Sequence, residues 1–261
     1  MTKILSFHEH VVAIAKKTEA ARANRQPDPN PEKPRDVIFA ALEEIAESLR
    51  PEGFTFLRSG PKLKRVQGDL TFQIPFQSDR NNFAGSRAGV WIHAGVHSQA
   101  LAKWRRSHPL PWHGTGPGLN SVTGGQIGNL LDEPTWMDWD FADVSRRKRE
   151  IEVAISAIRR IILPFFALFD DPANAVNTLV HRPLLWRPSL LEYASVAIGR
   201  EAAEVAGRSI LRRNPKIRRP FEEGLARVRY HGLPRYRSGL GIDLAAVAVA
   251  LDLDLSDPGQ A

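Results

Sequence analysis

The chain has 261 residues, enough for one large domain or two small ones, with 43% hydrophobic residues, 25% charged residues and a net charge of +7. It contains no cysteine, which excludes disulfides, thiolate zinc sites and cysteine nucleophiles. The segment from Met1 to His10 holds no apolar core of the secretory kind, and no window approaches about 18 uninterrupted apolar residues. We therefore expect a cytoplasmic protein without a membrane span.

The first predicted element is a helix at the N-terminus. Apolar residues recur at helical spacing over about 6–25. Residues 26–34 then hold four prolines, and proline interrupts a helix because its nitrogen carries no hydrogen and its ring clashes with the preceding turn. The pattern predicts an N-terminal helix over 1–25 and an extended, proline-rich linker over 26–35.

A second helix and several strands are predicted next. Over 36–49 the apolar residues form one helical stripe, and Asp36 is expected to cap its beginning. The run 54–57 is short and apolar, whereas 70–77 and 90–97 alternate apolar and polar residues, as strands with one face on a core do. Because Pro75 has no N–H, its run is expected at a sheet edge or a bulge.

Helices dominate the rest of the chain, after a long loop predicted over 107–139. Apolar residues return at helical spacing over 141–169, and Pro164 is expected to bend or break that helix near its end. These patterns predict an α+β domain over 36–170, an antiparallel sheet of about four or five strands flanked by helices. A C-terminal helical extension, rich in arginine, is expected over 171–255.

The predicted α+β domain also resembles a known family. In chain order, "LRPEGF", "GDLTFQIPFQSDRNN", "VWIHAGVHS" and "IRRIILPFFALF" carry the resemblance. Over about 36–170 the chain resembles the bacterial domain-of-unknown-function family numbered forty-three-oh-four. The resemblance implies an α+β sheet-and-helix domain and supplies no catalytic residues. It further implies an accessory or immunity-type binding protein rather than an enzyme.

The polar stretch from Gln77 to Asn82 joins the two alternating runs. Its Ser, Asp and Asn residues are the types that satisfy the backbone at turns, so a loop corner is one interpretation. The other interpretation is a polar ligand pocket lined by Gln77, Ser78 and Asn81, because loops at sheet ends collect binding groups. Ser78 lacks the G-x-S-x-G surroundings of an activated nucleophile.

Histidines on the second alternating run form another candidate site. Trp91, His93 and His97 share one strand face, but the two histidines lie about 13 Å apart at strand spacing and cannot bind one metal by themselves. With His113 and Asp140 they could form the metal site of a nuclease-like enzyme. A plainer interpretation makes the histidines packing residues and Asp140 the cap of the next helix. No cofactor is predicted.

The excess positive charge is concentrated near the C-terminus. Over 200–237 the chain has ten arginines and one lysine against four glutamates. The difference, +7, equals the net charge of the whole chain. The candidate binding residues in this segment are Arg212, Arg213, Arg218 and Arg219. Such a segment either covers a solvated face or attracts an acidic protein or a nucleic acid.

The sequence therefore favours a non-catalytic binding protein of immunity or defence-accessory type that recognises an acidic partner. The alternatives are a metal-dependent, nucleic-acid-associated enzyme and a nonspecific nucleic-acid binder. Few aromatic residues accompany the arginines, so base stacking is poorly supported.

Overall fold

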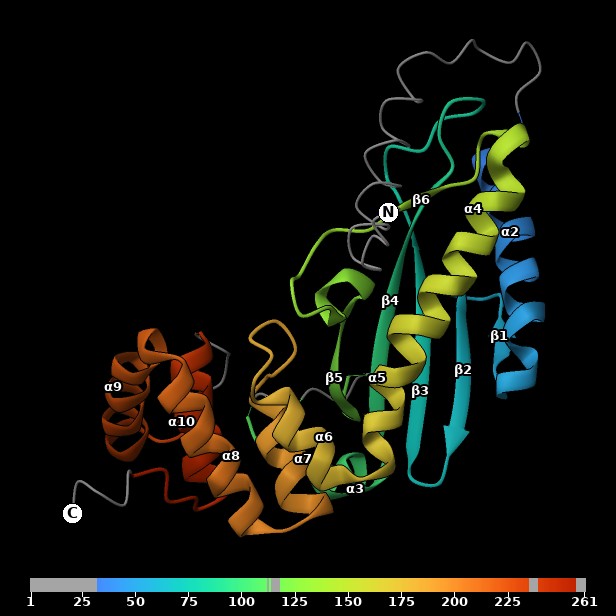
Figure 1. The fold of residues 1–261 in the computed structure, drawn as a ribbon. Coiled ribbons are helices and arrows are strands. Elements are labelled where there is room, and N and C mark those ends of the chain that lie inside the picture. Colours follow the sequence, from blue (N-terminus) through green and yellow to red (C-terminus); the bar gives the residue numbers. More distant parts are fainter. Residues whose placement is uncertain (1–31, 112, 114–117, 235–238, 257–261) are drawn as a thin grey trace, which may run out of the picture.

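The computed structural model describes residues 32–111, 113, 118–234 and 239–256. Its centre is an antiparallel sheet in the order β1-β2-β3-β4-β5, with β6 paired to the beginning of β4 (Figure 1). The predicted α+β fold, with a sheet and C-terminal helices, is confirmed. The strand bounds are β1 (Thr55–Leu57), β2 (Lys62–Gln67), β3 (Leu70–Ser78), β4 (Gly89–Ser98), β5 (Ser121–Gln126) and β6 (Trp139–Asp140).

Helices pack on one face of the sheet and extend beyond the β5 edge. Figure 1 shows α2 (Pro34–Leu49) and α4 (Val144–Ala157) lying across one face. Near one end of β5 lie α3 (Gln99–Ser107), α6 (Pro172–Leu179) and α7 (Ser189–Ala197). Farther out are α8 (Arg200–Arg213), α9 (Pro215–His231) and α10 (Leu240–Ala250). In the described part of the chain, no helix is both long and apolar enough to cross a membrane.

The alternating pattern of β3 and β4 separates a core face from an outer face. Phe72, Ile74, Ile92 and Val96 are buried in the main apolar cluster, while the residues between them on β4 are half-buried. Strand side chains point alternately to opposite faces, so the period-two pattern alone places these residues on the core side.

Pro75 lies in a central strand, which corrects the expectation of an edge or a bulge. β3 pairs with both β2 and β4, and its register against β4 is the same on both sides of Pro75. The missing N–H appears instead as a gap in the β3–β4 ladder, because neither Ile74 nor Pro75 has a β4 partner. The neighbouring pairs and the packed core offset the loss of that hydrogen bond.

Several helix and loop boundaries differ from those predicted. The helix α2 begins at Pro34, so the linker ends earlier and Asp36 lies in the first turn instead of capping it. Asp143 rather than Asp140 caps α4, because its carboxylate accepts the Ser145 N–H. The predicted loop over 107–139 contains β5, whose two glycines hide its pattern. The predicted N-terminal helix over 1–25 lies outside the described residues.

Pro164 changes the helix that contains it, as expected. After α4 the chain forms one π-helical turn, η3 (Ile158–Ile162), and then α5 (Leu163–Ala167) and the short η4 (Leu168–Asp170). The Leu163 N–H bonds to the Ile158 carbonyl, five residues back. Pro164 cannot donate the next helical hydrogen bond, and a single wider turn absorbs that loss.

Candidate functional site

The corner between β3 and β4 is built from side chains that satisfy the backbone. The Asp79 carboxylate accepts the Asn81 N–H at 2.9 Å. The side-chain oxygen of Asn82 accepts the Gly89 N–H at 2.5 Å, and its side-chain nitrogen donates to the Gly89 carbonyl at 2.9 Å. Asn82 also donates to the Ser78 hydroxyl. Asp79 and Asn82 thus hold the turn, whereas the hydrogen bond of Asn81 comes from its backbone.

Asp79 also joins a small ion-pair network that reaches the strand β6. Arg87 donates to Asp79 at 2.9 Å and to Asp138 at 2.8 Å. The hydrogen bond from the Asn81 backbone outweighs burial and, with Arg87, lowers the pKa of the Asp79 carboxyl. These ion pairs stabilise the corner, and the lowered pKa keeps the Asp79 carboxylate charged at physiological pH.

The three predicted pocket residues of the corner are exposed. Gln77 is exposed and lies opposite Trp91 in the β3–β4 register. Ser78 is exposed as well, and its hydroxyl oxygen accepts from Asn82 rather than donating to a base. Asn81 is likewise exposed. These three residues therefore lie on the surface of the turn, with no acid–base pair beside Ser78 among the described contacts.

Trp91, His93 and His97 lie on the outer face of β4, as the alternation predicted. Burial lowers the pKa of His93, and its Nε2 atom is buried without a hydrogen-bond partner in the described structure. The pKa of His97 is also lowered, mainly by burial. A hydrogen bond between its Nδ1 and the Asn120 side chain, at 3.1 Å, acts in the opposite direction but is the smaller effect. The described residues contain no cluster of three potential metal ligands.

The four residues of the enzymatic alternative are distributed over the molecule. Asp140 pairs with Gly89 at the beginning of β4, whereas His97 is near its end, about 26 Å away at strand spacing. The Asp140 carboxylate accepts the N–H groups of Ala88 and Ala142. His113 contacts Glu192 of α7. The fold therefore does not bring together His93, His97, His113 and Asp140.

A buried charge cluster that the sequence patterns did not indicate joins α3 to α7. The Arg105 guanidinium contacts the Glu192 carboxylate, with its Nε at 2.9 Å, and also donates to the Leu119 carbonyl at 2.7 Å. The Nε2 of His113 lies 2.7 Å from the other Glu192 oxygen, and its Nδ1 accepts the Leu110 N–H. His113 thus donates to Glu192 through Nε2–H.

The Glu192 side chain is 1% exposed, yet it is held in its charged form. Burial alone would raise its pKa, but the hydrogen bond from His113 and the charge and hydrogen bond of Arg105 outweigh it and lower the pKa. Both carboxylate oxygens are occupied from inside the protein. In the described part of the chain the cluster therefore fastens α3 to α7, and neither oxygen of the Glu192 carboxylate is left for a ligand.

The C-terminal helices carry a surface of cations without acidic partners. We define the basic surface as five exposed residues that form no ion pair with any described residue: Arg212, Arg213, Lys216, Arg227 and Arg229. Of the other two predicted binding residues, Arg219 pairs with Glu223 at 2.8 Å, and Arg218 is half-buried with contacts of its own.

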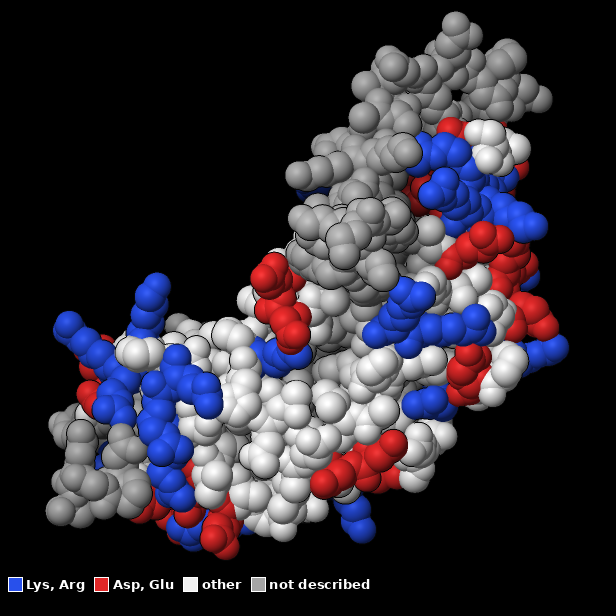
Figure 2. Space-filling model, viewed as in Figure 1, with Lys and Arg blue, Asp and Glu red and all other residues white. Residues whose placement is uncertain are grey.

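Tertiary contacts reduce the charge excess that the segment count suggested. Acidic residues from the chain after α10 return to the beginning of α8, where Arg200 pairs with Asp252 at 2.8 Å and Arg208 bonds to the Asp254 carbonyl. Over 200–256 the full sequence has eleven basic and seven acidic side chains, an excess of four positive charges instead of seven. Figure 2 shows blue side chains across α8 and α9 and red ones near the beginning of α8. The charge is therefore polarised toward the basic surface.

Two features thus remain as candidate sites: the outer face of β4 and the basic surface on α8 and α9. The outer face has half-buried histidines with lowered pKa values and no assembled ligand set. The basic surface has exposed cations with no neutralising partner in the described structure. No family model, no curated protein and no solved structure matches this chain.

Proposed function

We propose that this chain is a non-catalytic binding protein of immunity or defence-accessory type that recognises an acidic partner protein in the bacterial cytoplasm. The basic surface carries the proposal. Arg212 and Arg213 end α8, and no described carboxylate pairs with either. Unpaired cations on one side of a molecule speed the association with an acidic partner and set its orientation. The immunity or defence-accessory part of the proposal comes from the sequence resemblance over 36–170.

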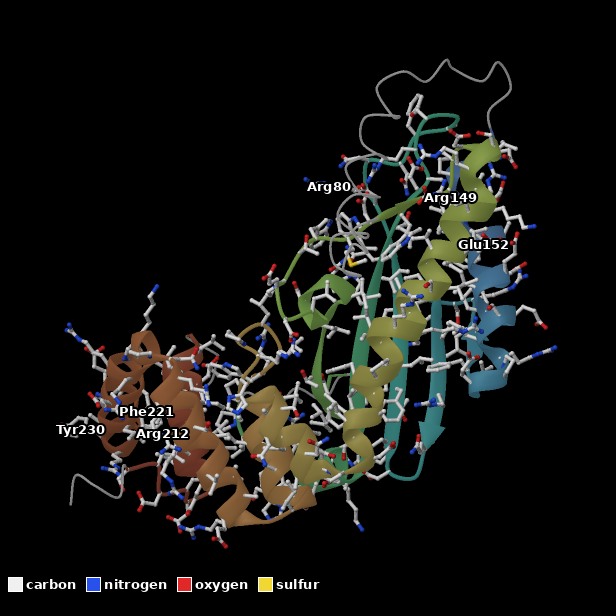
Figure 3. The ribbon with its side chains drawn as sticks, viewed as in Figure 1. Arg80, Arg149, Glu152, Arg212, Phe221 and Tyr230 are labelled. Carbon is white, nitrogen blue, oxygen red and sulfur yellow. The ribbon has the colours of Figure 1, made fainter. Side chains whose placement is uncertain are left out.

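The position of the basic surface supports partner binding more than stability. Figure 3 places Arg212 on the C-terminal helices, far from Arg149 on α4. Arg212 and Arg213 in the last turn of α8 interact favourably with the helix dipole, an effect of a few tenths of a kcal/mol to about 1 kcal/mol. One cation is enough for this interaction with the helix dipole. The interaction therefore does not account for the other exposed cations of the basic surface.

One observation favours nucleic acid as a second candidate partner. Tyr230 is 85% exposed, follows Arg229 directly and lies at the outer edge of the C-terminal helices (Figure 3). An exposed ring beside cations can stack on an unpaired base while the cations contact phosphates. A nonspecific binder of single-stranded nucleic acid is therefore the alternative that the test below must separate.

The test compares two polyanions and two matched variants by fluorescence anisotropy at several salt concentrations. Labelled polyglutamate represents an acidic protein, and a labelled single-stranded oligonucleotide represents nucleic acid. The variant Arg212→Glu/Arg213→Glu removes the centre of the basic surface. The control Lys148→Glu/Arg149→Glu makes the same charge change at two exposed residues of α4.

We expect polyglutamate to bind at low salt, with loss of binding in the first variant and retention in the control. Tighter oligonucleotide binding that weakens in Tyr230→Ala would establish the second candidate instead. Absence of binding to either polyanion, or equal loss in both charge variants, would refute the proposed role of the basic surface.

A further inference from the structure

A groove lies where the chain after η2 (Ile127–Leu130) approaches the loop after α6. Two adjoining hollows of about 280 and 920 Å³ form it, and they share Leu131, Asp132, Thr178 and Arg182. In Figure 1 these segments meet in the corner between the sheet and the C-terminal helices. The shared residues make the two hollows one continuous site, separate from the basic surface.

Arg182 lies at the junction of the two hollows and is the group that would recognise a ligand. Its guanidinium donates to the Leu130 carbonyl at 3.3 Å and pairs with Asp132 at 2.5 Å. The Arg182 side chain is 29% exposed, whereas that of Asp132 is 90% exposed. An ion pair with so exposed a carboxylate contributes little, so a second carboxylate can replace Asp132 at low cost.

The smaller hollow offers apolar surface next to this cation. Its apolar lining comes mainly from the end of the α4–α5 helix and from α6, and within it Pro164 and Leu168 are more exposed than the buried Ile161, Phe165, Leu179 and Leu185. The π-helical turn η3 supplies Ile161, and such turns occur frequently at functional sites. Arg160 also lines the hollow, next to the Arg182–Asp132 pair.

We propose that this groove binds a small amphipathic carboxylate. The carboxylate takes the place of Asp132 on the Arg182 guanidinium, which matches a carboxylate with two parallel donors. The apolar part of the ligand covers Pro164 and Leu168, the more exposed apolar residues of the α5 side of the smaller hollow. A cation of the same shape is rejected because its charged end would lie against the Arg182 guanidinium. The site is independent of the basic surface and of the function proposed for it.

The experiment is a calorimetric titration of the full chain with sodium decanoate, kept below the concentration at which decanoate forms micelles. We expect saturable binding at one site. Arg182→Ala should weaken it about tenfold or more, because a charge-assisted hydrogen bond is lost. Asp132→Asn should strengthen it up to about fivefold, because the competing carboxylate is gone. Decylamine should not bind at this site.

The controls separate this site from nonspecific apolar binding. Arg187→Ala removes an exposed arginine of the same loop that does not line either hollow, and it should leave the affinity unchanged. Asp132→Asn retains every contact of Arg182 with the backbone, so it tests the site even where Arg182→Ala perturbs folding. Absence of saturable binding, equal affinity for decylamine, or weaker binding by Asp132→Asn would overturn the proposal.

Discussion

The buried charge cluster gives a direct test of how the C-terminal helices are fastened to the sheet. The side chains of Arg105 and Glu192 are 4% and 1% exposed. Replacing Arg105 by alanine leaves the Glu192 carboxylate buried, with His113 as its remaining side-chain partner among the described residues. Removing one partner of a buried ion pair costs about 3–5 kcal/mol, so we expect the free energy of unfolding to fall by that amount.

Urea denaturation followed by circular dichroism measures this change, with the midpoint and slope giving the free energy of unfolding. Arg106→Ala is the matched control, because Arg106 is the next residue of α3 and is exposed. We expect that control to change the free energy by less than about 0.5 kcal/mol. A loss below about 1 kcal/mol for Arg105→Ala would refute the reasoning, since it is the lower end of the cost of an unsatisfied polar group.

A double variant separates the cost of an orphaned charge from the value of the pair. Arg105→Met with Glu192→Met removes both charges and keeps apolar volume in the same place. We expect it to be more stable than Arg105→Ala, because no carboxylate is left buried without its cation. If the double variant is less stable than that single one, the cluster contributes more than the orphaned charge explains.

Four further predictions concern the corner, the histidines and a tight turn. Asn82→Ala should lower the free energy of unfolding by about 1–2 kcal/mol through its lost backbone bonds, and Asn81→Ala should change it little; equal losses in urea titrations would contradict this. The pKa of Asp79 is lower in the folded than in the unfolded state, so ionised Asp79 adds to the free energy of unfolding above about pH 4. This contribution is lost as the pH falls through the folded-state pKa, and Asp79→Asn should flatten that part of the stability–pH curve. The pKa of His93 is also lowered, so its protonation should destabilise the fold as the pH falls below about 6.5, and an unchanged pH profile in His93→Gln would refute that assignment. Gly128→Ala would place Cβ 1.8 Å from the Thr135 carbonyl oxygen and should cost about 3 kcal/mol or more in thermal or urea unfolding; near-native stability would show that this turn relaxes.

Strong periodicity made the central strands and the long helices predictable. The alternation in 70–77 and 90–97 places a complete apolar face on the core, and the strands β3 and β4 follow it within one residue at each end. In contrast, β2 has a single fully buried residue, Leu63, among basic neighbours, so its pattern is weak. In β5, Gly124 lies so close to the β4 backbone that an added Cβ would be 2.6 Å from the Ala94 carbonyl oxygen. That approach is a property of the packed sheet, and the sequence alone does not reveal it.

Local residue chemistry predicted the corner only in part. Asx and Ser side chains indicated a turn between β3 and β4, and the turn is there. Asp79 and Asn82, and not Asn81, make the side-chain bonds across the turn because of where the chain returns beside them. Gly89 lies seven positions after Asn82, and Arg87 lies eight positions after Asp79. A turn motif constrains its own backbone, whereas the partner strand selects which side chain makes the cross-turn bonds.

The sequence by itself determined which segments are apolar on one face, where proline bends a helix and where arginines accumulate. Those properties depend on neighbours within a few positions. Only the tertiary structure decided that Arg105 meets Glu192, 87 positions away, and that Asp132 meets Arg182. It also brought Asp252 back to Arg200 and so reduced the local charge excess. Long-range pairs of charges leave no periodic signal, because the residues next to a carboxylate in the sequence do not specify its partner and the fold alone selects it.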